Sequence, residues 1–135
     1  MSVRRLAACT VTIAMAFGVL AVRPALAAPN AAAGSKIFHS ICGVCHLAVK
    51  DASLNDERIK IGPNLYGVVG RAAGTHRGFF YSPAMKKSHV VWTAEKLRAY
   101  IHEPQKTIPN VRMSFNGLPN LVDVDNVVAY LATLK

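Results

Sequence analysis

Apolar residues recur every three to four positions in three stretches of the chain, the spacing that places them on one face of a helix. The stretches cover residues 30–45, 93–103 and 123–134, and each begins with a short polar side chain suited to capping a helix. Their apolar positions are, in order, Gly34, Ile37, Phe38 and Ile41; Leu97, Tyr100 and Ile101; and Val124, Val127, Val128, Leu131 and Leu134. The pattern predicts an all-α fold with three main helices, in which the last helix packs against the Gly34 and Phe38 face of the first.

The segments between these helices are predicted to be mostly loops. Residues 47–61 are polar and charged, which favours a surface loop. A short helix is expected over residues 82–88, and Pro104 is expected to stop the helix that Thr93 caps. Residues 105–121 are rich in proline, asparagine and glycine, so we expect no regular structure there. Asp123 is expected to cap the last helix.

The first 27 residues have the layout of a secretory signal peptide. A basic start precedes an uncharged apolar stretch of 17 residues (6–22), and Ala25-Leu26-Ala27 follows as a small-x-small cleavage pattern. A retained membrane anchor is the alternative, but the stretch is short and rich in Ala and Thr, and Arg23 and Pro24 follow it directly. We therefore predict cleavage after Ala27, export to the periplasm, and one domain over residues 28–135.

The charge of the chain is strongly basic. The full sequence has a formal net charge of +9, and removal of the three arginines in residues 1–27 leaves +6. Such a surface favours partners with acidic docking faces. Nucleic acid is a poor alternative, because no nucleic-acid-binding motif accompanies the charge and the chain is predicted to be exported.

Cys42-Gly43-Val44-Cys45-His46 forms a C-x-x-C-H motif, the signature of covalent haem attachment. Positions i and i+3 lie on one face of a helical turn, so Cys42 and Cys45 can both reach one edge of a porphyrin. His46 can then serve as the proximal ligand of the iron. Half of a zinc site and a redox-active dithiol are the alternatives. Zinc needs further ligands, whereas Cys9 is the one other cysteine and lies in the signal segment, and no βαβ pattern surrounds the motif.

A sixth iron ligand must come from later in the chain or from another histidine. The candidates in residues 28–135 are Met85, Met113, His39, His76, His89 and His102. Methionine is more often a core residue than a ligand. Met113, however, lies in an irregular polar loop, where a core methionine has little use, whereas Met85 falls in a predicted helix. The residues therefore favour Met113.

An ordered set of further motifs resembles class I cytochrome c, especially the bacterial cytochrome c2 type. Besides the attachment motif, the resemblance is carried by Gly34-Ser35-Lys36-Ile37-Phe38, Gly62-Pro63-Asn64-Leu65-Tyr66-Gly67, Gly70-Arg71, Trp92, Ile108-Pro109, Met113-Ser114-Phe115-Asn116-Gly117-Leu118 and Ala129-Tyr130-Leu131. These motifs span nearly all of residues 28–135. The resemblance implies a small cytochrome c fold, in which three main helices, short helices and loops wrap around one covalent haem c.

The resemblance also implies roles for individual residues. It places the axial methionine at Met113, the carbonyl of Pro63 behind His46, and Tyr100 near the Met113 sulfur. Three residues would hydrogen-bond the haem propionates, namely Arg71, Tyr81 and Trp92. Ordinary core packing is the alternative for each aromatic residue. The chain departs from the family at Met85, where asparagine is frequent, and at Val111, where threonine is frequent, so two hydrogen bonds near the haem are in question.

With both axial positions filled, the expected function is that of a soluble one-electron carrier and not of an enzyme. The resemblance implies a monomer, at most peripheral to the membrane, that shuttles electrons between membrane or periplasmic redox complexes of the respiratory chain. A cytochrome bc1-type donor and an oxidase, reaction centre or reductase as acceptor are the expected partners. Two alternatives remain: a ligand-binding or peroxidase-like haem protein with a displaceable sixth ligand, and a dedicated cytochrome subunit of a dehydrogenase.

Overall fold

The computed structural model describes residues 28–52 and 60–135 of the chain. The predicted signal peptide and residues 53–59 of the predicted surface loop lie outside the described residues. Among the described residues, no helix is long and apolar enough to cross a membrane. Their one extended pairing is an isolated antiparallel bridge between Ala72 and Val91, so the prediction of an all-α fold is confirmed.

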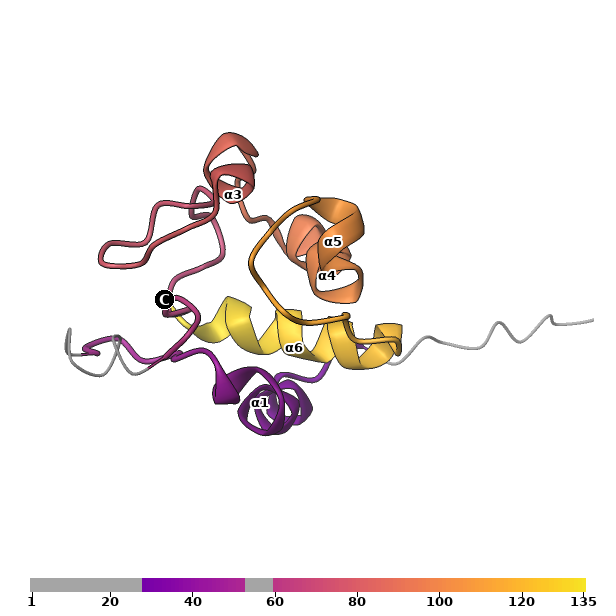
Figure 1. Cartoon of the computed structure of the whole chain (residues 1–135). Coiled ribbons are helices and arrows are strands. Elements are labelled where there is room, and N and C mark those ends of the chain that lie inside the picture. The colour runs from indigo at the N-terminus through magenta and orange to yellow at the C-terminus, as the bar shows by residue number, and fades with distance from the viewer. Residues whose placement is uncertain (1–27, 53–59) are drawn as a thin grey trace, which may run out of the picture.

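Two helices pack tightly against each other at the base of the molecule, α1 (Ala31–Ser40) and α6 (Leu121–Thr133) (Figure 1). Gly34 makes this packing possible, because a Cβ atom there would lie 1.8 Å from the backbone oxygen of Asn126. Phe38 of α1 and Val124 and Leu131 of α6 are almost completely buried. The predicted packing of the last helix on the Gly34 and Phe38 face is therefore confirmed.

The caps of these helices are partly as predicted. The side-chain oxygen of Asn30 caps α1 by accepting hydrogen bonds from the backbone amides of Ala32 and Ala33. The backbone amide of Asn30 donates to Oδ1 of Asn126 at 2.7 Å. The prediction that Asp123 caps the last helix was wrong. Asn120 is the cap, and α6 begins at Leu121, because the Asn120 side chain accepts from the amide of Val122.

The first helix is also shorter than predicted. It ends at Ser40. Instead of one helix running to Cys45, a separate 3-10 turn, η1 (Cys42–Val44), begins at Cys42 and is capped by Cys45. Ile41 separates the two segments, and its amide still bonds to the carbonyl of Ile37 at 3.0 Å. The tighter turn redirects the chain away from the axis of α1.

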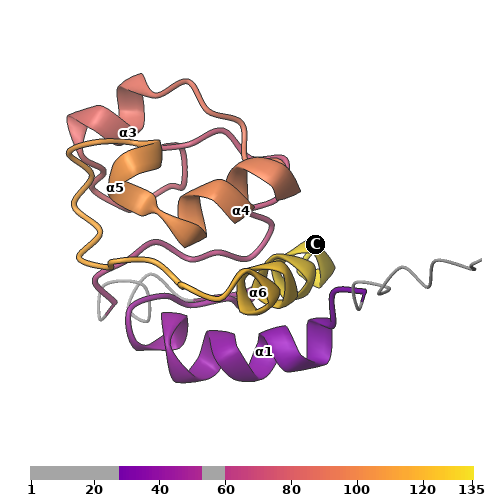
Figure 2. The same ribbon diagram turned by 90° about the vertical axis from the view of Figure 1, so that its right-hand side faces the viewer.

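Three helices lie on the other side of the molecule from α1, and the second of them also contacts α6 (Figure 2). They are α3 (Pro83–Lys87), α4 (Ala94–His102) and α5 (Pro104–Thr107). Ser82 caps α3 and Thr93 caps α4, in agreement with the predicted helices. The prediction that residues 105–121 lack regular structure was wrong for α5. Pro104 ends α4 but begins this next helix, because proline is well suited to a first helical position, where its missing N–H is not needed.

Candidate haem-binding site

One cavity of about 790 Å³ lies between the two groups of helices. Its volume falls within the range of ~300–1,000 Å³ usual for pockets that hold small molecules and cofactors. All nine residues predicted for the site line it: Cys42, Cys45, His46, Pro63, Arg71, Tyr81, Trp92, Tyr100 and Met113. Residues from opposite ends of the chain are therefore brought around one space, while the role of each residue stays a prediction.

The cysteine motif is held by its own backbone. The amides of Cys45 and His46 both donate to the carbonyl of Cys42, at 3.0 and 2.9 Å. In a 3-10 turn the side chains at i and i+3 are eclipsed, so Cys42 and Cys45 face the same side. Burial raises the pKa of the Cys42 thiol to about 11.

His46 has one nitrogen occupied by the protein. Its Nδ1 lies 2.7 Å from the carbonyl oxygen of Pro63, and because a carbonyl can only accept, Nδ1 carries the proton and donates. Nε2 then keeps the lone pair that a metal requires. Burial of the ring, the largest cause, lowers the pKa of His46, which favours this neutral form.

Two methionines line the cavity. Met113 lies on the irregular segment after α5 and is half-buried, whereas Met85 lies in α3 and is buried. Four histidines of the chain do not belong to the described lining: His39, His76, His89 and His102. Three of them are bonded elsewhere: the ring of His39 bonds to the carbonyl of Ser35, that of His76 to the guanidinium of Arg71, and that of His102 to the carbonyl of Leu118. The thioethers of Met113 and Met85 are therefore the candidates for a sixth ligand inside the cavity.

The three residues predicted to bind propionates lie in different surroundings. The Arg71 guanidinium donates to the backbone carbonyls of Asn64 at 2.9 Å and Tyr66 at 3.2 Å. The Trp92 ring is buried against Tyr100, with 4.9 Å between their centroids, and Tyr81 packs edge-on against Phe79. Burial raises the pKa of Tyr100 to about 12, so its hydroxyl stays protonated and can donate a hydrogen bond.

Two residues at the site were not predicted from the sequence. Lys60 donates from Nζ to the carbonyl of Gly43 at 2.7 Å, and so supports the turn that carries the cysteines. Gly62 lies against the His46 ring, because a Cβ at this position would be 2.4 Å from the ring carbon Cε1. The signal for Gly62 was its position directly before Pro63. No comparable signal marks Lys60, because it resembles any other surface lysine of a basic chain.

The donor set fits a covalently attached haem. Two thiols share one turn, an imidazole nitrogen is available beside them, and two thioethers belong to the same largely apolar enclosure. The two cysteines can form thioether bonds to the porphyrin. Imidazole and the thioether of methionine are both ligands that haem iron accepts. Zinc, by contrast, is usually bound by thiolate, imidazole and carboxylate rather than by thioethers.

Comparisons with known proteins agree with this chemistry. The chain is 44% identical over 102 residues to cytochrome c2 of Rhodopila globiformis, an alignment that covers 76% of this chain and 91% of that protein. It is 42% identical over 103 residues to cytochrome c2 of Rhodoblastus acidophilus, with coverage of 76% and 91%. Among solved structures, cytochrome cH from Methylobacterium extorquens superposes with a TM-score of 0.67 at 37% identity, covering 77% of this chain and 98% of that one. No family model matches the chain.

Proposed function

From the premise that the chain belongs to the cytochrome c family of electron carriers and carries covalent haem c, we propose the ligands of the iron. His46 and Met113 would bind it from opposite faces of the haem. Cys42 and Cys45 would hold the porphyrin through thioether bonds. The observation that supports the proposal best is the single cavity that both proposed ligands line, with Nδ1 of His46 engaged by Pro63.

The residues around the cavity suit electron transfer without bond-making chemistry. The haem supplies a reversible one-electron couple at its iron. The hydrogen bond that His46 Nδ1 donates to the carbonyl of Pro63 orients the imidazole ring and makes Nε2 a stronger ligand. The Met113 thioether, a weak neutral donor, and the apolar lining both favour the less charged reduced state. Arg71, Tyr81 and Trp92 are proposed to stabilise the propionates, and Tyr100 to lie beside the Met113 sulfur.

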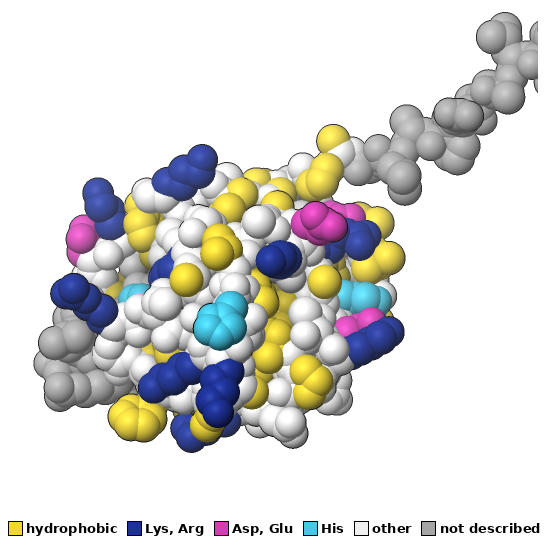
Figure 3. All heavy atoms as spheres, turned by 90° about the horizontal axis from the view of Figure 1, so that it is seen from above, with side chains coloured by type: hydrophobic (Ala, Val, Ile, Leu, Met, Phe, Trp, Pro, Cys, Tyr) yellow, Lys and Arg dark blue, Asp and Glu magenta, His cyan; other side chains and the backbone are white. Residues whose placement is uncertain are grey.

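The charged surface supports docking to acidic partners. On the face shown in Figure 3, lysine and arginine side chains are spread around a hydrophobic band, and acidic side chains are few. The exposed basic residues include Lys36, Lys50, Lys86, Lys87, Lys106 and Arg112. Association through such charges is fast, weak and sensitive to salt. We propose a cytochrome bc1-type complex as donor and an oxidase, reaction centre or reductase as acceptor.

The place of this exchange is proposed from the amino-terminal sequence. Residues 1–27 would direct export and be removed after Ala27, which leaves a cytochrome domain over residues 28–135 in the periplasm. There the protein would act as a monomer that meets membrane complexes only peripherally. Amino-terminal sequencing of the protein purified from periplasm tests the cleavage.

Replacing each methionine in turn tests the ligation. The full chain is produced with haem in a host that attaches haem c, and the long-wavelength absorption band of a methionine–iron(III) bond is measured. We expect Met113→Ala to lose this band and to bind CO promptly when reduced, because the sixth position opens. Met85→Ala is the matched control, since Met85 lines the same cavity. It is expected to keep the band.

Two outcomes contradict the proposal. Loss of the band in Met85→Ala together with its survival in Met113→Ala would identify Met85 as the ligand. Prompt CO binding by the unaltered reduced protein would mean that the sixth ligand is displaceable, which favours the ligand-binding or peroxidase-like alternative.

A further inference from the structure

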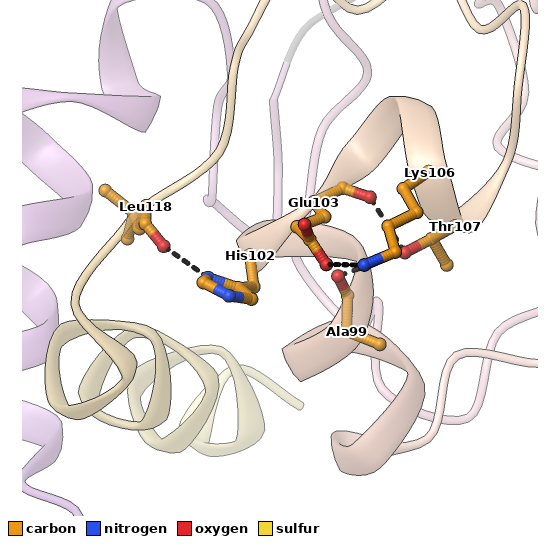
Figure 4. A network of polar contacts seen from close by, with 6 residues as sticks. All are labelled: Ala99, His102, Glu103, Lys106, Thr107 and Leu118. Atoms are coloured by element: carbon orange, nitrogen blue, oxygen red, sulfur yellow. Dashed lines mark hydrogen bonds and ion pairs between the residues drawn. The ribbon is translucent and has the colours of Figure 1, made fainter.

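The segment that carries Met113 is anchored firmly at its far end. Leu118 donates its amide to the carbonyl of Ile101 at 3.0 Å and accepts from Nδ1 of His102 at 2.8 Å (Figure 4). Gly117 lies so close to α4 that a Cβ there would be 1.8 Å from the backbone oxygen of His102. Ile108 is buried at the near end. The residues between these anchors, 109–117, form no helix or strand.

Gln105 reaches this segment from α5. Its Nε2 donates to the carbonyl of Val111 at 3.1 Å and lies 3.4 Å from the carbonyl of Met113. The Val111 contact is partly buried, since Val111 is 8% exposed, so water replaces this bond less readily than one at an open surface.

The surroundings of Gln105 explain why one amide matters here. A surface pocket of about 230 Å³ is lined by residues of α5 on one side and by Phe115 and Asn116 on the other. Val111 packs in the core but has no side-chain donor or acceptor. Its backbone carbonyl is a polar group through which the segment can be held, and it accepts a hydrogen bond from Gln105.

We propose that Gln105 is a positioning residue that holds Met113 at the haem. The inference rests on the proposed function, in which Met113 is the sixth ligand. An open state in which the backbone at 111–113 moves away from α5 requires the hydrogen bonds to Gln105 to break. The amide therefore stabilises the Met113-bound state relative to an open state and lowers the population of the open state.

Imidazole binding to the oxidised holoprotein tests the proposal, because imidazole can bind the iron only when Met113 has left. Gln105→Ala removes the donor, and Gln105→Glu replaces it by a group of the same shape that cannot donate. From the usual worth of one hydrogen bond, we expect imidazole to bind roughly 3- to 10-fold more tightly to both variants than to the unaltered protein. The long-wavelength methionine band is expected to persist without imidazole, since Met113 still rebinds.

Lys106→Gln is the matched control. It removes one positive charge, as Gln105→Glu adds one negative charge, and it lies next to Gln105 on α5. The ion pair that it breaks, Lys106 with Glu103, is exposed and contributes little to stability (Figure 4). The imidazole affinity of this variant is expected to stay within about 2-fold of that of the unaltered protein, a smaller change than loss of the Gln105 hydrogen bond should produce.

The outcomes separate the two proposals. If the unaltered protein lacks the methionine band, the ligation by Met113 fails and the inference falls with it. If the band is present but the Gln105 variants bind imidazole as the unaltered protein does, only the role of Gln105 is wrong. An equal change in Lys106→Gln would show that the effect is not specific to the Gln105 amide and would also overturn the role of Gln105.

Discussion

The two sides of the cavity are built in different ways. On the His46 side, the residues proposed to bind haem lie within one five-residue motif, and their turn is held by its own backbone. Gly62 and Pro63 lie directly against the His46 ring. On the Met113 side, one thioether lies on an irregular segment held at its far end by Leu118 and near its middle by Gln105. The His46 side is held by its own turn together with residues 60–63, whereas the Met113 side is held by contacts with α4 and α5.

This difference predicts which substitutions affect global stability and which affect ligand exchange. Substitutions that disturb α1 or α6 should lower the stability of the whole fold, because these two helices form its most extensive contact. Changes near Met113 act on a segment that can move locally without global unfolding. Stability and ligand exchange should therefore respond to different residues.

Gly34→Ala is expected to have the largest effect of the variants that distinguish the two sides. The new methyl group would collide with the backbone of α6 at Asn126, so the helices must separate. We expect the free energy of unfolding to fall by about 3 kcal/mol, as for severe overpacking of a core. Chemical denaturation of the holoprotein measures it. Ala32→Ser, which adds one atom at an exposed position of α1, serves as control, and equal stability of the two variants would contradict the close packing.

Gly117→Ala should have a smaller effect on stability and a larger one on ligand exchange. Its Cβ would collide with the backbone oxygen of His102, and its φ of +99° is unfavourable for alanine, but the segment can shift to relieve both. We expect a loss of about 1–2 kcal/mol in unfolding and tighter imidazole binding. Gly70→Ala has a comparable φ of +88° and open space around its Cβ. If this control binds imidazole equally tightly, contact with α4 does not hold the Met113 segment.

Lys60→Met is expected to have the smallest effect and to be confined to the His46 side. It removes the hydrogen bond to the carbonyl of Gly43, so unfolding should become easier by about 0.5–1.5 kcal/mol. Imidazole binding should not change, because Met113 is unaffected. Lys36→Met, at an exposed lysine of α1, controls for the lost charge. A change in imidazole affinity in Lys60→Met alone would show that the two sides are coupled.

Much of the fold was predictable because helical periodicity is a local property. The three main helices, the caps at Asn30 and Thr93, and the packing face of α1 all follow from spacing over a few residues. The errors concern helix ends. Asn120 rather than Asp123 caps α6, and Pro104 begins α5 as well as ending α4, since several residues in each region can serve and the packing selects one.

The sequence by itself determined the haem chemistry, because the covalent chain places two thiols and an imidazole within five residues, whatever the rest of the protein does. It also placed a methionine in a polar loop. Only the tertiary structure decided what holds these groups. Three contacts depend on how separate segments pack: Gly34 with Asn126, Lys60 with Gly43, and Gln105 with Val111. The spacing of residues along the chain cannot predict such contacts, because the partners are brought together only by the fold.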